Sequence, residues 1–252
     1  MAVINSFLMI GQSNMAGRGY FHEAKEIDSS RIFTLRNGRW HPMFRPINPD
    51  RSFSGVNLAE SFAEQYAKAN DVDVGLICCA DGGTSLDQWQ PGGVLFDHAV
   101  LQAQLAQRTS TIVGILWHQG EADCAEELYS TYQTRFETML TALRKALNLP
   151  NVPVLLGGLG DFLKFRFSEP VLANYEHVND ALKNIAQNDP AIGFVSAEGL
   201  ASNPDNLHFS AAALYDFGIR YFEEHKRLCG QTGISVEEMP DSDLNRRAME
   251  LL

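Results

Sequence analysis

The 252-residue chain lacks any apolar run close to the length of a membrane-spanning helix, and it is poor in positive charge. A helix needs about 20 apolar residues to cross a bilayer, so we expect no membrane partner. Lysine and arginine together number 20, against 31 aspartate and glutamate residues, which gives a net charge of −11. Because phosphate backbones are bound by concentrated positive charge, we expect no nucleic-acid partner either.

Cysteine is scarce too, and the four residues have no spacing typical of a metal site: Cys78, Cys79, Cys124 and Cys229. The first two are adjacent in an apolar run, where neighbouring side chains point to opposite faces of a strand. We therefore expect buried thiols in preference to a disulfide. No basic segment with an apolar core and a cleavage site precedes the first apolar run, which favours a cytoplasmic protein. A secreted chain whose signal peptide had been removed would have the same sequence.

Apolar runs and amphipathic segments alternate along the chain. Strands are expected in five apolar runs, at residues 3–10, 72–80, 111–117, 152–156 and 192–196. Helices are expected between and after them, at residues 57–69, 95–107, 125–147, 171–187 and 209–228. The turn-forming pair Asn37-Gly38 predicts a small hairpin at residues 31–41. Alternation of this kind predicts parallel strands in a three-layer α/β/α sandwich.

A chain of this length can fold as one large α/β domain that buries most of its surface without disulfides. We expect that domain at residues 1–230, since no internal repeat or low-complexity segment divides it. The acidic segment at residues 231–252 is expected to form a peripheral tail or helix.

Ser13 follows the first apolar run by way of Gly11. A strand, a sharp glycine turn and a hydroxyl group, in that order, present a nucleophile at the carboxyl edge of an open α/β sheet. A serine after a strand also commonly caps the next helix, which is the alternative interpretation of Ser13. More distant segments of the chain favour the nucleophile.

Two further polar segments follow expected strands and should lie at the same edge, namely Asp81-Gly82-Gly83-Thr84-Ser85 and Trp117-His118-Gln119-Gly120-Glu121. A fourth candidate segment, Asp205-Asn206-Leu207-His208, precedes the last expected helix. His208 is the candidate base that removes the proton of Ser13, and Asp205 is the candidate acid that fixes the histidine tautomer. Negative charge that develops on a substrate oxygen needs hydrogen-bond donors already in place. The candidate donors are the Ser13 N–H, the N–H of Gly82 or Gly83, and the Gln119 amide.

Four blocks spread over residues 3–228 resemble those of the SGNH hydrolase superfamily: Gly11-Gln12-Ser13-Asn14-Met15, Gly82-Gly83-Thr84, Trp117-His118-Gln119-Gly120-Glu121 and Asp205-Asn206-Leu207-His208. More narrowly, they resemble carbohydrate esterase family 6 and the sialate O-acetylesterase-like domain. Gln12 stands where aspartate is commoner in the superfamily and Gln119 where asparagine is usual, and both features are similar to the acetylesterase branch. The resemblance implies a mainly parallel, flavodoxin-like sheet, serine hydrolysis without a metal or cofactor, and O-acetyl esters of sugars as substrates.

Five residues are further candidates for substrate contact or for support of the site: Gln12, Asn14, His118, Glu121 and Trp89. His118 is a rival base, but the side chains on either side of it point to the opposite face, so a structural hydrogen bond is favoured. Glu121 and Asp123 are expected to open a long helix, where carboxylates meet the positive end of the helix dipole. A metal site of His118, Glu121 and Asp123 matches no familiar ligand spacing. For Trp89 and Trp40, a sugar-stacking surface and core packing are equally favoured.

The sequence therefore predicts a serine esterase that removes acetyl or other short acyl groups from an O-acetylated carbohydrate through an acyl-enzyme. The expected substrate is a small molecule or an oligosaccharide. The alternatives are a general short-chain carboxylesterase and a non-catalytic carbohydrate-binding protein of the same fold. An α/β-hydrolase is disfavoured because its Gly-x-Ser-x-Gly elbow needs glycine where Met15 stands.

Overall fold

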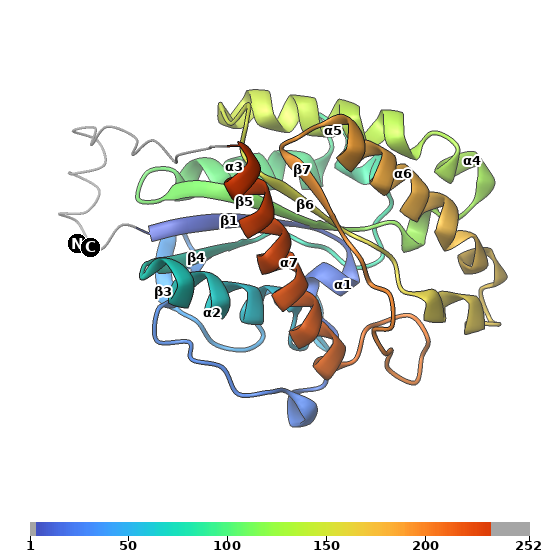
Figure 1. Cartoon of the computed structure of the whole chain (residues 1–252), viewed down its shortest axis with the longest axis horizontal. Helices are drawn as coiled ribbons and strands as arrows, with labels where there is room; N and C mark the ends of the chain where they lie inside the picture. Colours follow the sequence, from blue (N-terminus) through green and yellow to red (C-terminus); the bar gives the residue numbers. More distant parts are fainter. Residues whose placement is uncertain (1–3, 233–252) are drawn as a thin grey trace.

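The computed structural model describes residues 4–232 and shows a seven-stranded sheet with helices on both faces (Figure 1). The strand order is β3-β2-β4-β1-β5-β6-β7, and every neighbouring pair is parallel except β2 with β3. The strands are β1 (Ile4–Gly11), β2 (Ile32–Arg36), β3 (Arg39–Pro42), β4 (Asp73–Cys78), β5 (Thr111–His118), β6 (Val154–Gly157) and β7 (Ile192–Val195). The predicted three-layer α/β/α sandwich with a mainly parallel sheet is confirmed.

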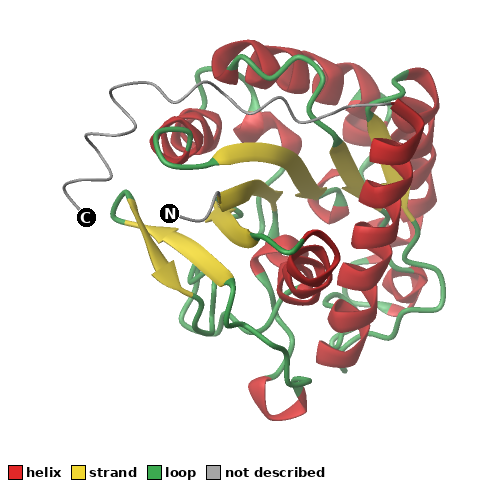
Figure 2. Ribbon diagram, turned by 60° about the vertical axis from the view of Figure 1, so that its left-hand side comes forward, coloured by secondary structure: helices red, strands yellow, loops and turns green. Residues whose placement is uncertain are grey.

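Helices α2 and α7 pack against each other on one face of the sheet, and α3, α5 and α6 cover the other face (Figure 2). The helices are α1 (Ser13–Ala16), α2 (Leu58–Asn70), α3 (Val94–Ala106), α4 (Glu126–Tyr129), α5 (Tyr132–Leu147), α6 (Tyr175–Asn188) and α7 (Ala211–Thr232). Short 3₁₀ helices join them: η1 (Phe21–Glu23), η2 (Leu86–Trp89), η3 (Glu121–Asp123), η4 (Asp161–Phe165) and η5 (Pro170–Asn174). Because β1 is central and covered on both faces, Phe7, Leu8 and Met9 are fully buried.

Two local features of the fold follow directly from the residues. The hairpin turns at Asn37 and Gly38, whose φ angles of 52° and 73° fit the tight turn that this pair favours. Helix α2 begins at Asn57, which caps the N–H of Ala59 while Glu60 reaches back to the Asn57 N–H.

Two helices differ from their predicted extents. The helix expected at residues 125–147 is divided into α4 and α5, because Thr131 has φ −113° and ψ 3° and leaves the helical range. The helix expected from residue 171 begins at Tyr175, after the 3₁₀ helix η5. There the Asn174 side chain donates to Cys124 O at 3.1 Å and its backbone departs from α-helical geometry.

All four cysteines are free thiols. Cys79 and Cys124 are buried, as expected, whereas Cys78 and Cys229 are half-buried. Within residues 4–232, no helix combines the length and apolar character needed to cross a bilayer. The predicted C-terminal tail, from residue 233 onward, lies outside the described residues.

Candidate active site

Ser13 is presented by a turn that only glycine can make. Gly11 ends β1 with φ +131°, and a Cβ placed there would lie 2.1 Å from the backbone oxygen of His118. Gln12 then donates its N–H to that same oxygen at 2.9 Å, and the chain turns at once into α1. Gln12, and not Ser13, occupies the N-cap position of α1, so the capping interpretation of Ser13 does not hold.

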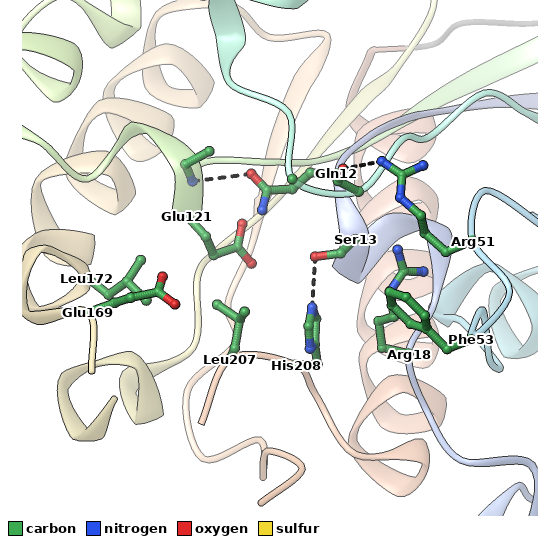
Figure 3. Close-up of a pocket in the computed structure, with 13 residues that line it drawn as sticks. Gln12, Ser13, Arg18, Arg51, Phe53, Glu121, Glu169, Leu172, Leu207 and His208 are labelled. Carbon is green, nitrogen blue, oxygen red and sulfur yellow. Dashed lines mark hydrogen bonds between the residues drawn. The ribbon is translucent and has the colours of Figure 1, made fainter. Parts of the chain in front are cut away.

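Ser13, His208 and Asp205 lie in one hydrogen-bonded row. His208 Nε2 is 3.0 Å from Ser13 Oγ (Figure 3). On the other side of the ring, His208 Nδ1 is 2.6 Å from Asp205 Oδ2. Asp205 Oδ1 also accepts the backbone N–H groups of Leu207 and His208, each at 3.0 Å. Partial burial raises the pKa of Asp205, but hydrogen bonds from His208 and these backbone groups outweigh it and lower the pKa to about 2. Asp205 is therefore ionised and can hold a proton on Nδ1.

Asn14 connects the serine turn to the histidine loop. Its Nδ2 donates to Leu207 O at 3.1 Å, and its Oδ1 accepts the N–H of Phe209 at 3.1 Å. These two backbone groups flank His208 on either side. The same Nδ2 donates to Glu121 Oε1 at 2.5 Å, and Asn14 is 1% exposed, so its orientation is fixed from three directions.

Of the two glycines considered as oxyanion donors, the geometry favours Gly83. The N–H of Gly82 donates to Asp50 Oδ2 at 2.9 Å, and the same oxygen accepts Arg18 Nη2 at 2.7 Å. Within the described residues, the N–H groups of Ser13 and Gly83 have no acceptor. Gly83 has φ +78°, which places it in the left-handed region that favours glycine.

The Gln119 amide is not placed where the sequence interpretation needs it. Gln119 is fully buried, and its Nε2 donates to Thr84 O at 3.1 Å and to Asp123 Oδ2 at 2.5 Å. Its Oε1 accepts the Tyr132 hydroxyl at 3.0 Å. Both amide hydrogens are thus used, and Gln119 is absent from the described wall of the cavity beside Ser13. Its contact with Thr84 instead supports the loop that carries Gly82 and Gly83.

Gln12 offers an amide in place of Gln119. Its Oε1 accepts the N–H groups of Gly120 and Ala122, at 3.3 and 3.4 Å. These two bonds fix the orientation of the Gln12 amide group. Gln12 lines the cavity together with Ser13 (Figure 3). Nothing in the described part of the chain accepts a hydrogen bond from its Nε2.

His118 has the structural role favoured from the sequence. It is fully buried, with Nε2 3.2 Å from Gly158 O and the rings of Phe209 and Phe217 edge-on to it. Burial lowers the pKa of His118 more than the nearby Glu121 charge raises it, so the ring is neutral at pH 7. It does not contact Ser13, and His208 is the histidine that does.

The prediction that Glu121 and Asp123 open a long helix is wrong. They form η3, three residues before α4 begins, and their carboxylates bind groups of other segments instead of the first turn of α4 or α5. Asp123 accepts the N–H of Leu86 at 2.8 Å and Arg135 Nη2 at 2.9 Å. These contacts, together with the one to Gln119, occupy both of its oxygens. Across residues 4–232, no cluster of histidine, cysteine and acidic side chains has the arrangement of a metal site.

Trp89 does not offer a sugar-stacking surface. It is 1% exposed, packs edge-to-face on Trp117 with ring centroids 5.7 Å apart, and donates Nε1–H to Thr84 Oγ1 at 3.1 Å. Trp40 packs over Gly75 of the sheet and donates to Thr109 Oγ1 at 3.1 Å. Core packing is therefore the correct interpretation of Trp89.

A cavity of about 410 Å³ opens over Ser13, large enough for a sugar unit with its acyl group. Its lining comes from several loops at the carboxyl edge of the sheet: Gln12, Ser13, Arg18, Arg51, Phe53, Gly82, Gly83, Glu121, Ala122, Glu169, Leu172, Leu207 and His208. Five of these lining residues are not predicted from the sequence: Arg18, Arg51, Phe53, Glu169 and Leu172. The first four lie in segments without a motif or periodic pattern, and Leu172 lies at the start of a segment expected to be an ordinary helix.

Comparison with known proteins points to one family. The family described as carbohydrate esterase, sialic acid-specific acetylesterase, matches residues 3–227. A protein of Arabidopsis thaliana described as a probable carbohydrate esterase is 27% identical over 240 residues, which cover 84% of this chain and 86% of the plant protein.

Solved structures share the fold. The X-ray structure of an Arabidopsis thaliana protein has a TM-score of 0.78 at 24% identity and covers 90% of this chain and 99% of that one. NanS has a TM-score of 0.73 at 17% identity, with 91% and 98% of the two chains covered. A carbohydrate acetylesterase of Xanthomonas citri has a TM-score of 0.65 at 16% identity, covering 90% of this chain and 57% of that one.

Proposed function

Because the chain belongs to the carbohydrate esterase family of sialic acid-specific acetylesterases, we propose that it removes acetyl groups from O-acetylated sugars by serine catalysis. The family assignment supports a carboxylic ester hydrolase that acts on carbohydrates and disfavours the alternative of a non-catalytic binding protein. The observation that carries the mechanism is the 3.0 Å contact between His208 Nε2 and Ser13 Oγ, with Asp205 on the other ring nitrogen.

In the first step His208 Nε2 accepts the Ser13 proton while Ser13 Oγ forms a bond to the acetyl carbonyl carbon. The carbonyl π electrons move onto the oxygen, and a tetrahedral intermediate forms. Asp205, ionised because its pKa is lowered to about 2, stabilises the imidazolium through Nδ1–H.

In this proposal three groups donate hydrogen bonds to the negative oxygen: the N–H of Ser13, the N–H of Gly83 and the Gln12 amide. All three line the cavity, and the turns that carry them are held by other contacts before substrate binds. Such donors stabilise the intermediate more than the ester, which lowers the barrier.

The intermediate collapses when the bond to the sugar oxygen breaks and His208 Nε2–H gives its proton to that oxygen. The sugar leaves with a free hydroxyl group, and the acetyl group stays on Ser13. Water then attacks the acetyl carbon with His208 as base, and acetate is released with Ser13 restored.

The test measures acetate released from O-acetylated sialic acid and from penta-acetyl glucose. Wild type should release acetate from at least one of them. Ser13→Ala should lower the rate by at least about 10³-fold, whereas Ser168→Ala, at an exposed serine, should keep it. Cleavage of methyl acetate with neither sugar ester cleaved would favour the general short-chain carboxylesterase.

A further inference from the structure

Phe53 is exposed at the edge of the catalytic cavity. Its side chain is 68% exposed although it lines the same cavity as Ser13 and His208. A phenylalanine in that position contributes little to the core, so folding does not account for it. The guanidinium carbon of Arg18 lies 5.2 Å from the centre of the ring and backs it from the protein side.

The loop that carries Phe53 is held firmly on both sides of the residue. Asp50 pairs with Arg18 through two hydrogen bonds, at 3.0 and 2.7 Å, and accepts the Ser54 hydroxyl at 2.7 Å. Arg51 donates Nη2 hydrogens to Asp81 Oδ1 at 2.7 Å and to Gly82 O at 2.8 Å. The loop is thus fixed to the Gly82–Gly83 turn, and the chain on both sides of Phe53 is held in place before any ligand arrives.

The two sides of the cavity differ in chemistry. Figure 3 shows Phe53, Arg18 and Arg51 on one side of Ser13, and Leu207 and Leu172, together with Glu121 and Glu169, on the other. Leucine side chains suit a methyl group. The Phe53 ring face beside the partly exposed guanidinium of Arg51 suits a sugar ring. The C–H groups of a sugar gather on one face of its ring, and its hydroxyl groups lie at the edge.

We propose that Phe53 is the stacking platform for the sugar ring of the leaving group, with Arg51 donating to a ring hydroxyl or carboxylate. This assignment rests on the proposed function and adds a specificity-determining residue to it. The acetyl methyl then lies toward Leu207, and the ester oxygen of the sugar lies within reach of His208.

The experiment compares kcat/KM for an O-acetylated sugar with kcat/KM for methyl acetate, which has no ring. In Phe53→Ala the ratio of the two should fall about tenfold, the loss expected when an aromatic contact worth roughly 1.4 kcal/mol is removed. Phe53→Leu should show most of this loss because it keeps apolar area without a flat face. Phe53→Tyr should keep the ratio of the wild type.

Phe44→Ala is the matched control. Phe44 is also exposed, at 53%, and also stacks on an arginine, Arg36, at 3.9 Å, but it is not among the described residues that line the cavity. Its replacement should leave the ratio unchanged. Equal ratios in Phe53→Ala, Phe44→Ala and wild type would overturn the platform and leave the proposed function intact. Wild type that cleaves methyl acetate but no sugar ester would contradict the proposed function itself.

Discussion

The side chain of Asn14 accepts a hydrogen bond from the backbone N–H of Phe209 at 3.1 Å, and this contact joins the residue after the nucleophile to the residue after the base. Asn14 also donates to Leu207 O at 3.1 Å. The distance between Ser13 and His208 is therefore set by a buried amide as well as by the backbone of each loop. Glu121 holds the amide in turn.

Asn14→Ala should lower kcat by about 10–100-fold with little change in KM, because His208 is no longer held against Ser13. The loss of buried partners for Leu207 O and Phe209 N should also cost about 1–3 kcal/mol of stability. Asn5→Ala removes a side-chain hydrogen bond to Tyr66 at the opposite end of β1 and serves as control. If Asn5→Ala lowers kcat as much as Asn14→Ala does, the effect is general destabilisation.

Gln12→Glu should lower kcat by about 10²–10³-fold, since it keeps the oxygen that accepts from Gly120 and Ala122 but loses the amide donor. Gln119→Met should instead lower the melting temperature, because Asp123 and Thr84 lose a buried donor. Steady-state kinetics and thermal unfolding of both variants make the comparison. A large loss of kcat in Gln119→Met with an unchanged melting temperature would return the donor role to Gln119.

Asp50→Asn should destabilise the protein by about 3 kcal/mol at pH 7, because buried Arg18 loses its ionised partner. Burial raises the pKa of Asp50, but Arg18, Ser54 and the Gly82 N–H together lower it below its ordinary value of 3.8. The ionised form is therefore stabilising above pH 3.8, and this stabilisation is lost as the pH falls through the lower folded-state value. In urea unfolding, the difference in free energy of unfolding between wild type and Asp50→Asn should become smaller below pH 3.8. A difference that stays constant with pH would contradict a stabilising ion pair between Asp50 and Arg18.

His225 should make the fold sensitive to mild acid. Burial between Phe7, Phe62 and Tyr66 lowers its pKa below 6.5, so below pH 6.5 the unfolded state binds a proton that the folded state does not. The free energy of unfolding should then fall with decreasing pH, by up to about 1.4 kcal/mol per pH unit for this residue. His225→Phe should flatten that slope, and His22→Gln, at an exposed histidine, should not. If the free energy of unfolding has the same pH dependence in wild type and in both variants, His225 is not the source of the acid sensitivity.

The fold and the row of Ser13, His208 and Asp205 could be predicted from the sequence because strand ends and local spacing determine them. The roles of Gln119 and Glu121 could not, because they depend on buried contacts between segments: Gln119 donates to Asp123, and Glu121 accepts from Asn14. The break before α5 depends on the backbone angles of Thr131 alone, and the spacing of apolar residues along the sequence gives no information about them. Phe53 lies in a polar loop without a motif, so its place at the cavity is visible only in three dimensions.

The most direct test of serine catalysis is the labelling of the protein with a serine-directed phosphonate, followed by peptide mass spectrometry. We expect one equivalent of label, on Ser13, with parallel loss of esterase activity. His208→Ala should label far more slowly, because no base then removes the Ser13 proton. Complete inactivation with the label on another residue, or undiminished labelling of Ser13 in His208→Ala, would contradict the proposed roles of Ser13 and His208.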